Sequence, residues 1–166
     1  MNKEDEIIKQ DYNRAVNMWN ETYSHCKIVD LKGKSLSVEP MFDICLDIFA
    51  SKCKNILDFG CGTGDVIFQC YEFGNMNFGL GVDLSETGIQ YARKMTSLNN
   101  YKSLNFDIGD ISYFDSYEEG SFDGIILSNV LDVMPKDVAV KTFNRLTDLL
   151  SPKGLIKSLL RQSRYG

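Results

Sequence analysis

The chain has 166 residues, of which 43% are hydrophobic and 25% charged, as in an ordinary globular domain. A net charge of −5 and a sequence pI near 4.9 argue against nucleic acid as the main partner, because phosphate binding needs a basic face.

Two further features concern the cellular setting. The first ten residues are charged, and no apolar run approaches the length of a membrane span, so the sequence predicts neither a secretory signal nor a membrane partner. The five cysteines are odd in number and form no C-x-x-C pair. We therefore predict a cytoplasmic protein with reduced thiols, without a disulfide scaffold and without a metal site.

The N-terminal part, residues 1–38, is predicted to form a helix and a loop. Apolar side chains recur at helical spacing between about Glu4 and Tyr23, which indicates an amphipathic helix. The stretch from Ser24 to Ser37 is polar and reads as a loop. Pro40 suits the first turn of a second helix. The apolar face expected for that helix consists of Met41, Ile44, Cys45, Ile48 and Phe49.

A glycine-rich turn follows the first predicted strand, residues 55–59. Glycines at positions 60, 62 and 64 let the backbone turn sharply and approach a ligand closely. Asp83 ends the next strand-like run, 23 positions after Gly60, which suits a carboxylate that binds ribose hydroxyls. This part of the chain therefore predicts a nucleoside site.

The spacing of the turn narrows the choice of nucleoside. A dinucleotide fold would have its third glycine at position 65, which is Asp65 here, and an acid at a helix start repels a pyrophosphate. No Gly-Lys-Ser/Thr follows, which excludes a P-loop. What remains is a nucleoside with little or no negative charge.

Strand and helix patterns alternate through the rest of the chain. Five strands are expected, at about 55–59, 77–83, 104–108, 122–128 and 155–160. Ser85 can cap a helix from Glu86 to Thr96, and Pro135 precedes a helical run whose apolar positions are Ala139, Phe143, Leu146 and Leu150. Such alternation predicts an α/β fold with a doubly wound, mainly parallel sheet.

Five stretches in order resemble the landmarks of the class I, Rossmann-like methyltransferases that use S-adenosyl-L-methionine. Residues 58–64 resemble the first motif of that family, 79–85 its ribose-binding strand and 106–111 its adenine-binding turn. Residues 122–129 resemble its fourth strand, and 150–154 the turn before its fifth. The similarity covers roughly residues 39–160, and it implies strand order 3-2-1-4-5 and a methyltransferase domain at 39–166.

The sequence departs from this family at the end of the predicted sheet. The sequence continues for six residues after the predicted fifth strand, so we expect this chain to lack the usual sixth and seventh strands and to expose 155–160 as an apolar edge. Either the domain is truncated, or another chain (as in a homodimer) or the N-terminal segment covers the edge. The sequence leaves these alternatives open.

The resemblance implies a set of cofactor-binding residues. Asp58 would order the loop or accept a hydrogen bond from the cofactor's ammonium group, Asp83 with neighbouring Leu84 would bind the ribose, and Asp110 with the Ile111 amide would bind the adenine. Asp107 offers a competing register for the adenine. The other expected cofactor contacts are Gly60, Cys61, Gly62, Gly64, Ser128 and Asn129.

Candidate substrate contacts come from two segments. Tyr12, Trp19 and Tyr23 of the first helix resemble an aromatic lid over the cofactor, although packing against the sheet explains them equally. Asp132 is a candidate contact for the acceptor or a residue of a helix start. His25 is a candidate general base or an idle loop residue, and no catalytic residue is assigned.

The predicted activity is transfer of a methyl group from S-adenosyl-L-methionine to an unidentified acceptor of small-molecule type. The alternative is a methyltransferase-like module, or a truncated fragment, that binds the cofactor without turnover. The acceptor itself is not encoded in any motif that we recognise.

Overall fold

The computed structural model describes residues 3–31 and 40–159. The strands β1 (Asn55–Phe59), β2 (Phe78–Asp83), β3 (Leu104–Ile108), β4 (Phe122–Ser128) and β5 (Leu150–Leu159) form one sheet in the order β3-β2-β1-β4-β5. Every pairing is parallel. The predicted doubly wound fold and its strand order are therefore confirmed.

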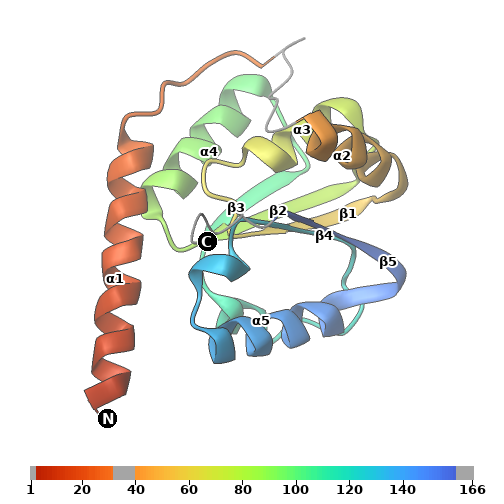
Figure 1. The fold of residues 1–166 in the computed structure, drawn as a ribbon. Coiled ribbons are helices and arrows are strands. Elements are labelled where there is room, and N and C mark those ends of the chain that lie inside the picture. The colour runs from red at the N-terminus through yellow and green to blue at the C-terminus, as the bar shows by residue number, and fades with distance from the viewer. Residues whose placement is uncertain (1–2, 32–39, 160–166) are drawn as a thin grey trace.

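Helices cover both faces of the sheet. Figure 1 shows α2 (Pro40–Lys52), α3 (Asp65–Phe73) and α4 (Glu86–Asn99) on one face and α5 (Lys136–Leu149) on the other. Two short 3-10 turns, η1 (Ile111–Phe114) and η2 (Leu131–Val133), follow β3 and β4. The long helix α1 (Lys3–Ser24) stands at the side of the domain against α4.

The core is divided by the sheet into two layers, because successive side chains of a strand point to opposite faces. In β1, Ile56 packs with α2, α3 and α4, while Leu57 and Phe59 pack on the side of α5. The same alternation places Asp58 on the face of Ile56, where it is 1% exposed. The strand pattern thus carries a carboxylate into the interior, next to the glycine turn.

The predicted apolar face of α2 is wrong for all but one of its members. Met41, Ile44 and Ile48 are 65%, 56% and 53% exposed, and Cys45 is exposed as well. The face that packs on the sheet contains Phe42, Leu46, Phe49 and Ala50. Both sets have helical spacing, so the sequence pattern alone does not decide between them. Phe49 belongs to both sets, and Phe42, which is 3% exposed, is buried with it in place of Met41.

The predicted face of α5 is also partly wrong. Phe143 is 39% exposed, and Leu150 belongs to β5, whereas Thr142, Leu146 and Leu149 form the buried stripe. β5 begins five residues before the predicted position 155, because the Ser-Pro-Lys-Gly stretch continues the strand irregularly. Lys153 has a φ of +69°, and the register of β4 and β5 shifts between Phe122 and Gly124.

Other boundaries differ less. Ser85 caps α4 as predicted, since its side chain accepts a hydrogen bond from the Gly88 N–H at 3.1 Å. The helix continues three residues past the predicted Thr96 and ends where Asn100 adopts a left-handed conformation. The predicted loop is irregular as far as Leu31, which is buried and donates its N–H to Asn99. The rest of that loop lies outside the described residues.

β5 lies at an edge of the sheet and pairs, within the described ranges, with β4. The predicted homodimer over this edge stays a prediction. None of the helices in the described part of the chain is both long and apolar enough to cross a lipid bilayer.

Candidate functional site

A cavity of about 710 Å³ lies at the carboxyl ends of the central strands, where open α/β sheets bind ligands. The turn after β1, the end of β2, the turn after β3 and the segment after β4 all contribute to it, and α1 forms a further wall. Ten of the eleven predicted cofactor residues line it, namely Asp58, Gly60, Cys61, Gly62, Asp83, Leu84, Asp110, Ile111, Ser128 and Asn129.

Gly64 is the predicted cofactor residue that does not line this cavity. Its φ is +83°, and a Cβ there would come within 2.9 Å of the Phe106 ring. Its role is thus to start α3 in a left-handed conformation and to admit core packing. Gly62, with φ +53°, does line the cavity, and a Cβ there would lie 2.5 Å from the Tyr23 hydroxyl oxygen.

Asp83 ties the end of β2 to the glycine turn. Its Oδ2 accepts a hydrogen bond from the Gly62 N–H at 2.8 Å, and its Oδ1 accepts one from the Ser85 N–H at 2.7 Å. Burial raises the pKa of this carboxyl group, and these amide donors partly oppose the shift. Each carboxylate oxygen has a second lone pair, so Asp83 can hold the turn and still accept from a ligand.

Asp58 is a buried residue that lines the cavity, and its side chain makes no hydrogen bond to the described residues. Both carboxylate oxygens are buried without a hydrogen-bond partner, although the Ile67 N–H is close enough to favour the charged form. Burial, and then the charges of Asp83 and Asp65, raise the pKa of Asp58 to about 8. An unpaired buried carboxyl costs free energy unless a ligand supplies a cation or donors. Asp58 therefore suits a positively charged ligand group.

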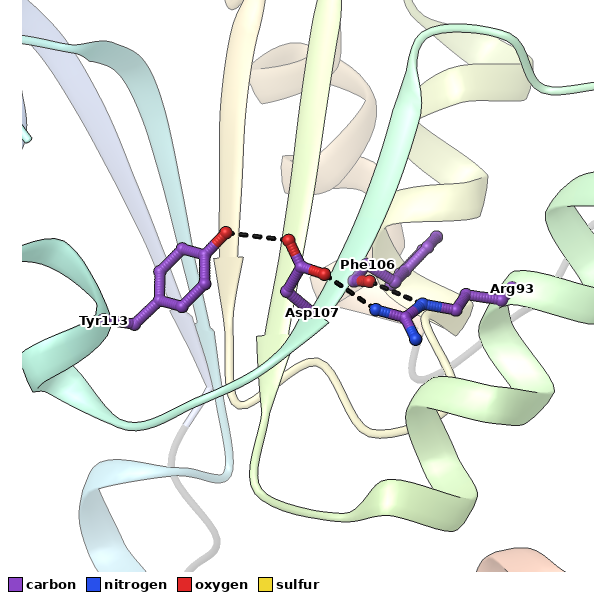
Figure 2. Close-up of polar contacts among 4 residues, drawn as sticks. All are labelled: Arg93, Phe106, Asp107 and Tyr113. Carbon is purple, nitrogen blue, oxygen red and sulfur yellow. Dashed lines mark hydrogen bonds and ion pairs between the residues drawn. The ribbon is translucent and has the colours of Figure 1, made fainter.

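The two aspartates that compete for the adenine position have separate roles. Figure 2 shows Asp107 between Arg93 and Tyr113, and its carboxylate accepts a hydrogen bond from each at 2.7 Å. The Arg93 Nε also donates to the Phe106 carbonyl, so this cluster fastens β3 to α4 and η1. Each oxygen of the Asp107 carboxylate therefore already has a hydrogen-bond partner within the protein. Asp110 lines the cavity instead.

Asp110 also caps the turn that follows it. Its Oδ1 accepts from the Ser112 N–H at 2.9 Å and from the Ser112 hydroxyl at 2.6 Å. No hydrogen bond to its Oδ2 is found among the described residues, and this oxygen is open to a ligand donor.

The segment after β4 is shaped by Asn129. This residue has a φ of +53°, and its N–H donates to the Leu159 carbonyl at 2.7 Å, next to the edge of the sheet. The neighbouring Ser128 lines the cavity as well. Asp132, the candidate acceptor contact, is exposed in η2 and lies outside the cavity lining.

Helix α1 contributes two stacked aromatic rings to the cavity wall. The ring centroids of Trp19 and Tyr23 are 5.5 Å apart with an interplanar angle of 20°. Burial raises the pKa of the Tyr23 hydroxyl, and the Asp83 charge adds to the shift, so the phenol is neutral. Tyr12 belongs to α1, but its side chain lies outside the described part. His25 is exposed and does not line the cavity.

Asn20 is a residue that the sequence analysis missed. Its Oδ1 accepts from the hydroxyls of Ser85 and Thr87, each at 2.7 Å, and from the Thr87 N–H at 3.3 Å. These contacts fix α1 to the first turn of α4, directly beside Asp83. A mid-helix asparagine between two aromatic positions is the one hint in the sequence, because asparagine is unfavourable there without a partner.

Cys61 lines the cavity as a neutral thiol. Burial, followed by the charge of Asp58, raises its pKa well above the usual value, so it is a poor nucleophile. Within residues 3–31 and 40–159, no group of three or more His, Cys, Asp or Glu side chains is arranged to hold a metal ion.

Comparisons with known proteins agree on one family. A family model described as a methyltransferase domain matches residues 50–160. The human tRNA N(3)-cytidine methyltransferase METTL2B is 34% identical over 131 residues, which are 75% of this chain and 33% of that protein. The ubiquinone biosynthesis O-methyltransferase of Neisseria meningitidis serogroup A is 23% identical over 92% of this chain and 60% of its own length.

A solved structure shows the same fold. Phosphoethanolamine N-methyltransferase 1 of Haemonchus contortus, in complex with phosphoethanolamine and S-adenosylhomocysteine, superposes with a TM-score of 0.67 at 15% identity. The match covers 90% of this chain and 32% of that one. The chain spans between a third and three fifths of the length of these two curated relatives.

Proposed function

The chain belongs to the methyltransferase-domain family, and on that premise we propose that it binds S-adenosyl-L-methionine and transfers the methyl group to a small-molecule acceptor in the cytoplasm. The relatives include both a tRNA methyltransferase and an O-methyltransferase of ubiquinone biosynthesis, so family membership alone does not select the acceptor.

The observation that carries this proposal is the unpaired carboxyl of Asp58. It is buried at the floor of the cavity with a pKa raised to about 8, so its environment lacks a positive partner. The ammonium group of a methionyl moiety would supply both charge and N–H donors, and hydrogen bonds to charged groups contribute about 1.5–3 kcal/mol. A cationic ligand would thus lower the pKa of Asp58 and be held by the ionised form.

The remaining polar groups fit the rest of the cofactor. Asp83 has lone pairs left for a ribose diol after it has accepted from the Gly62 and Ser85 amides. Asp110 and the Ile111 amide, in the turn after β3, would accept from and donate to the adenine. The backbone at Gly60 and Gly62, which lines the cavity, would contact the methionyl portion.

The bound cofactor supplies an electrophilic methyl group on sulfur. The chain's own residues have the tasks of binding, orientation and exclusion of water. Such positioning accounts for up to about 7–11 kcal/mol of a barrier, so a nucleophilic side chain is not needed. Asp83 and Asn20 link the parts of the site through their hydrogen bonds, and α1 would act as a lid over it.

The alternative function is binding of the cofactor without turnover. It is supported by the position of β5 at an edge of the sheet, where a further strand or a second copy of the chain would extend the sheet. Isothermal titration with S-adenosylmethionine and with S-adenosylhomocysteine tests binding. Release of S-adenosylhomocysteine in the presence of acceptors tests turnover. Tight binding with no release over a broad acceptor panel favours the module, and sedimentation velocity shows whether a dimer accompanies either activity.

A further inference from the structure

The cavity extends beyond the residues assigned to the cofactor. This further part lies between α1 and the segment η2–α5, and its side chains are mostly apolar: Ala15, Val16, Trp19, Val133, Met134 and Val138. Val133 is 55% exposed, so a ligand in this place would remove apolar surface from water. From here on this set of six residues is called the acceptor wall.

We propose that the acceptor is an uncharged, largely apolar small molecule that carries no phosphate or carboxylate group. The inference rests on the proposed methyl transfer and specifies the substrate class of that same site. It depends on two observations, the apolar acceptor wall and the sign of the charges around it.

All side chains among the described lining residues of the cavity that can carry a full charge near neutral pH are acidic. They are Asp58, Asp65, Asp83, Asp110 and Asp137, and no lysine, arginine or histidine joins them. Recognition of phosphate and carboxylate groups uses arginine, lysine or helix N-termini. An anionic acceptor would lie among like charges, and the described lining residues include no basic side chain to pair with it. A nucleic acid or a phosphorylated amine is therefore a poor fit.

A positively charged acceptor is disfavoured for a different reason. The reacting atom must approach the sulfonium methyl, and two positive charges repel each other at that distance. An amine can moreover attack only in its neutral form. The acceptor is thus uncharged when it reacts.

Asp137 is the one charged side chain that the η2–α5 segment contributes to the cavity. It lies in the first turn of α5. In this position its carboxylate can accept a hydrogen bond from the acceptor's hydroxyl group. In the transfer the hydroxyl oxygen bonds to the methyl carbon, the carbon–sulfur bond breaks and its electron pair stays on sulfur. The hydroxyl proton leaves to Asp137 or to water.

The test uses two probes that differ only at the end of the alkyl chain, which carries a methyl group in one and a carboxylate in the other. Para-butylphenol is uncharged at pH 7.5, and para-hydroxyphenylbutanoate has the same ring and hydroxyl with a carboxylate at the end of the chain. Binding of each to the full chain saturated with S-adenosylhomocysteine is measured by titration, and methylation by release of S-adenosylhomocysteine. We expect para-butylphenol to bind at least about tenfold more tightly and to be the methylated probe.

Substitutions on α5 test whether para-butylphenol binds at the acceptor wall. Val138→Lys places a cation on the acceptor wall and should weaken para-butylphenol at least about tenfold while the affinity for S-adenosylmethionine stays within about twofold. Val140→Lys is the matched control, because Val140 is 53% exposed on the same helix and does not line the cavity. Asp137→Asn should lower kcat for para-butylphenol more than it raises KM, with rescue by Asp137→Glu.

The results of these experiments distinguish a failure of the proposed function from a failure of the proposed acceptor class. If S-adenosylmethionine does not bind the unmodified chain, the proposed function fails, and this inference fails with it. If S-adenosylmethionine binds but neither probe does, or the carboxylate probe or a tRNA transcript is preferred, the acceptor class is wrong while the proposed function stands.

Discussion

The Asp83 carboxylate and the Gly62 amide are 2.8 Å apart, and this single hydrogen bond links the end of β2 to the glycine turn after β1. The carboxylate that is proposed to bind the ribose is also the group that shapes the turn around the methionyl portion. A change at Asp83 therefore affects two parts of the cofactor site at once.

We expect Asp83→Asn to weaken the binding of S-adenosylmethionine at least about tenfold. The amide side chain can accept from only one of the two N–H groups of Gly62 and Ser85, and it loses the charge that a ribose diol prefers. Titration calorimetry measures the affinity. Asp148→Asn, on the exposed side of α5, is the control that should leave it unchanged. Unaltered affinity of the Asp83 variant contradicts the ribose assignment.

Asp58 is expected to make the stability of the ligand-free protein depend on pH. Its pKa is about 8 in the folded state and near 4 when unfolded, so the folded state holds an extra proton between these values. Stability must then fall as pH rises from about 4 to about 8. At pH 8 we expect Asp58→Asn to be more stable than the parent by at least about 2 kcal/mol, or roughly 4–8 °C in Tm.

The same variant should bind S-adenosylmethionine at least about tenfold more weakly at pH 8, because it cannot ionise. Thermal melts from pH 5 to pH 8, with and without the cofactor, measure both effects. The stability difference between variant and parent should shrink towards pH 5. A gap that is constant over this range is incompatible with a raised pKa at Asp58.

Gly62→Ala should displace Tyr23, because the added Cβ would lie 2.5 Å from the phenol oxygen. The backbone at φ +53° adds strain that remains when the ring is removed. We therefore expect the substitution to cost more stability in the parent than in a Tyr23→Ala background, with a coupling of about 1 kcal/mol or more. A double-mutant cycle by chemical denaturation measures this term, and additive effects would show that ring and turn are independent.

Asn20→Ala should loosen the end of α1 from α4. The Ser85 hydroxyl and the Thr87 N–H lose their acceptor, while the Thr87 hydroxyl keeps the backbone carbonyl of residue 20, and unpaired part-buried donors cost about 1–3 kcal/mol. Hydrogen exchange should rise over residues 15–24, and KM for the cofactor should increase. Asn17→Ala, an exposed position of the same helix, is the control and should exchange like the parent.

The two aspartates after β3 give a test of the adenine register. Asp110→Asn should weaken cofactor binding about tenfold, since its free oxygen is assigned to the adenine amino group. Asp107→Asn should leave affinity within about twofold and reduce stability slightly, because its partners Arg93 and Tyr113 are structural. The reverse ranking of the two affinities would transfer the adenine contact to Asp107.

Much of the fold followed from local patterns. Alternating strands and helices predicted the doubly wound parallel sheet, and the resemblance to the methyltransferase family implied its strand order. The buried faces of α2 and α5 could not be predicted from local patterns. In α2, Met41 and Phe42 are both apolar, and only the packing of the helix on the sheet decides which of the two is buried. The early start of β5 was missed for a similar reason, since its pairing with β4 overrides a turn-like local sequence.

In the candidate site, too, some residues could be predicted from the sequence and others could not. Asp58, Gly62 and Asp83 could be placed at the cavity because the sequence motif fixes their positions at or just beyond the carboxyl ends of β1 and β2. The packing of Gly64 against Phe106 could not be predicted from the sequence, because the two residues are 42 positions apart. Asn20 escaped notice since its partners are more than 60 residues distant. Such contacts are products of the tertiary structure.

The junction of α1 with α4 has an evolutionary consequence. One amide oxygen accepts from three donors of two residues, namely the hydroxyls of Ser85 and Thr87 and the Thr87 N–H, so a substitution at position 20 removes this shared acceptor from positions 85 and 87 together. Homologous sequences that replace Asn20 should therefore show covariation at both of the other positions. Those that retain Ser85 and Thr87 should keep an acceptor of the same reach.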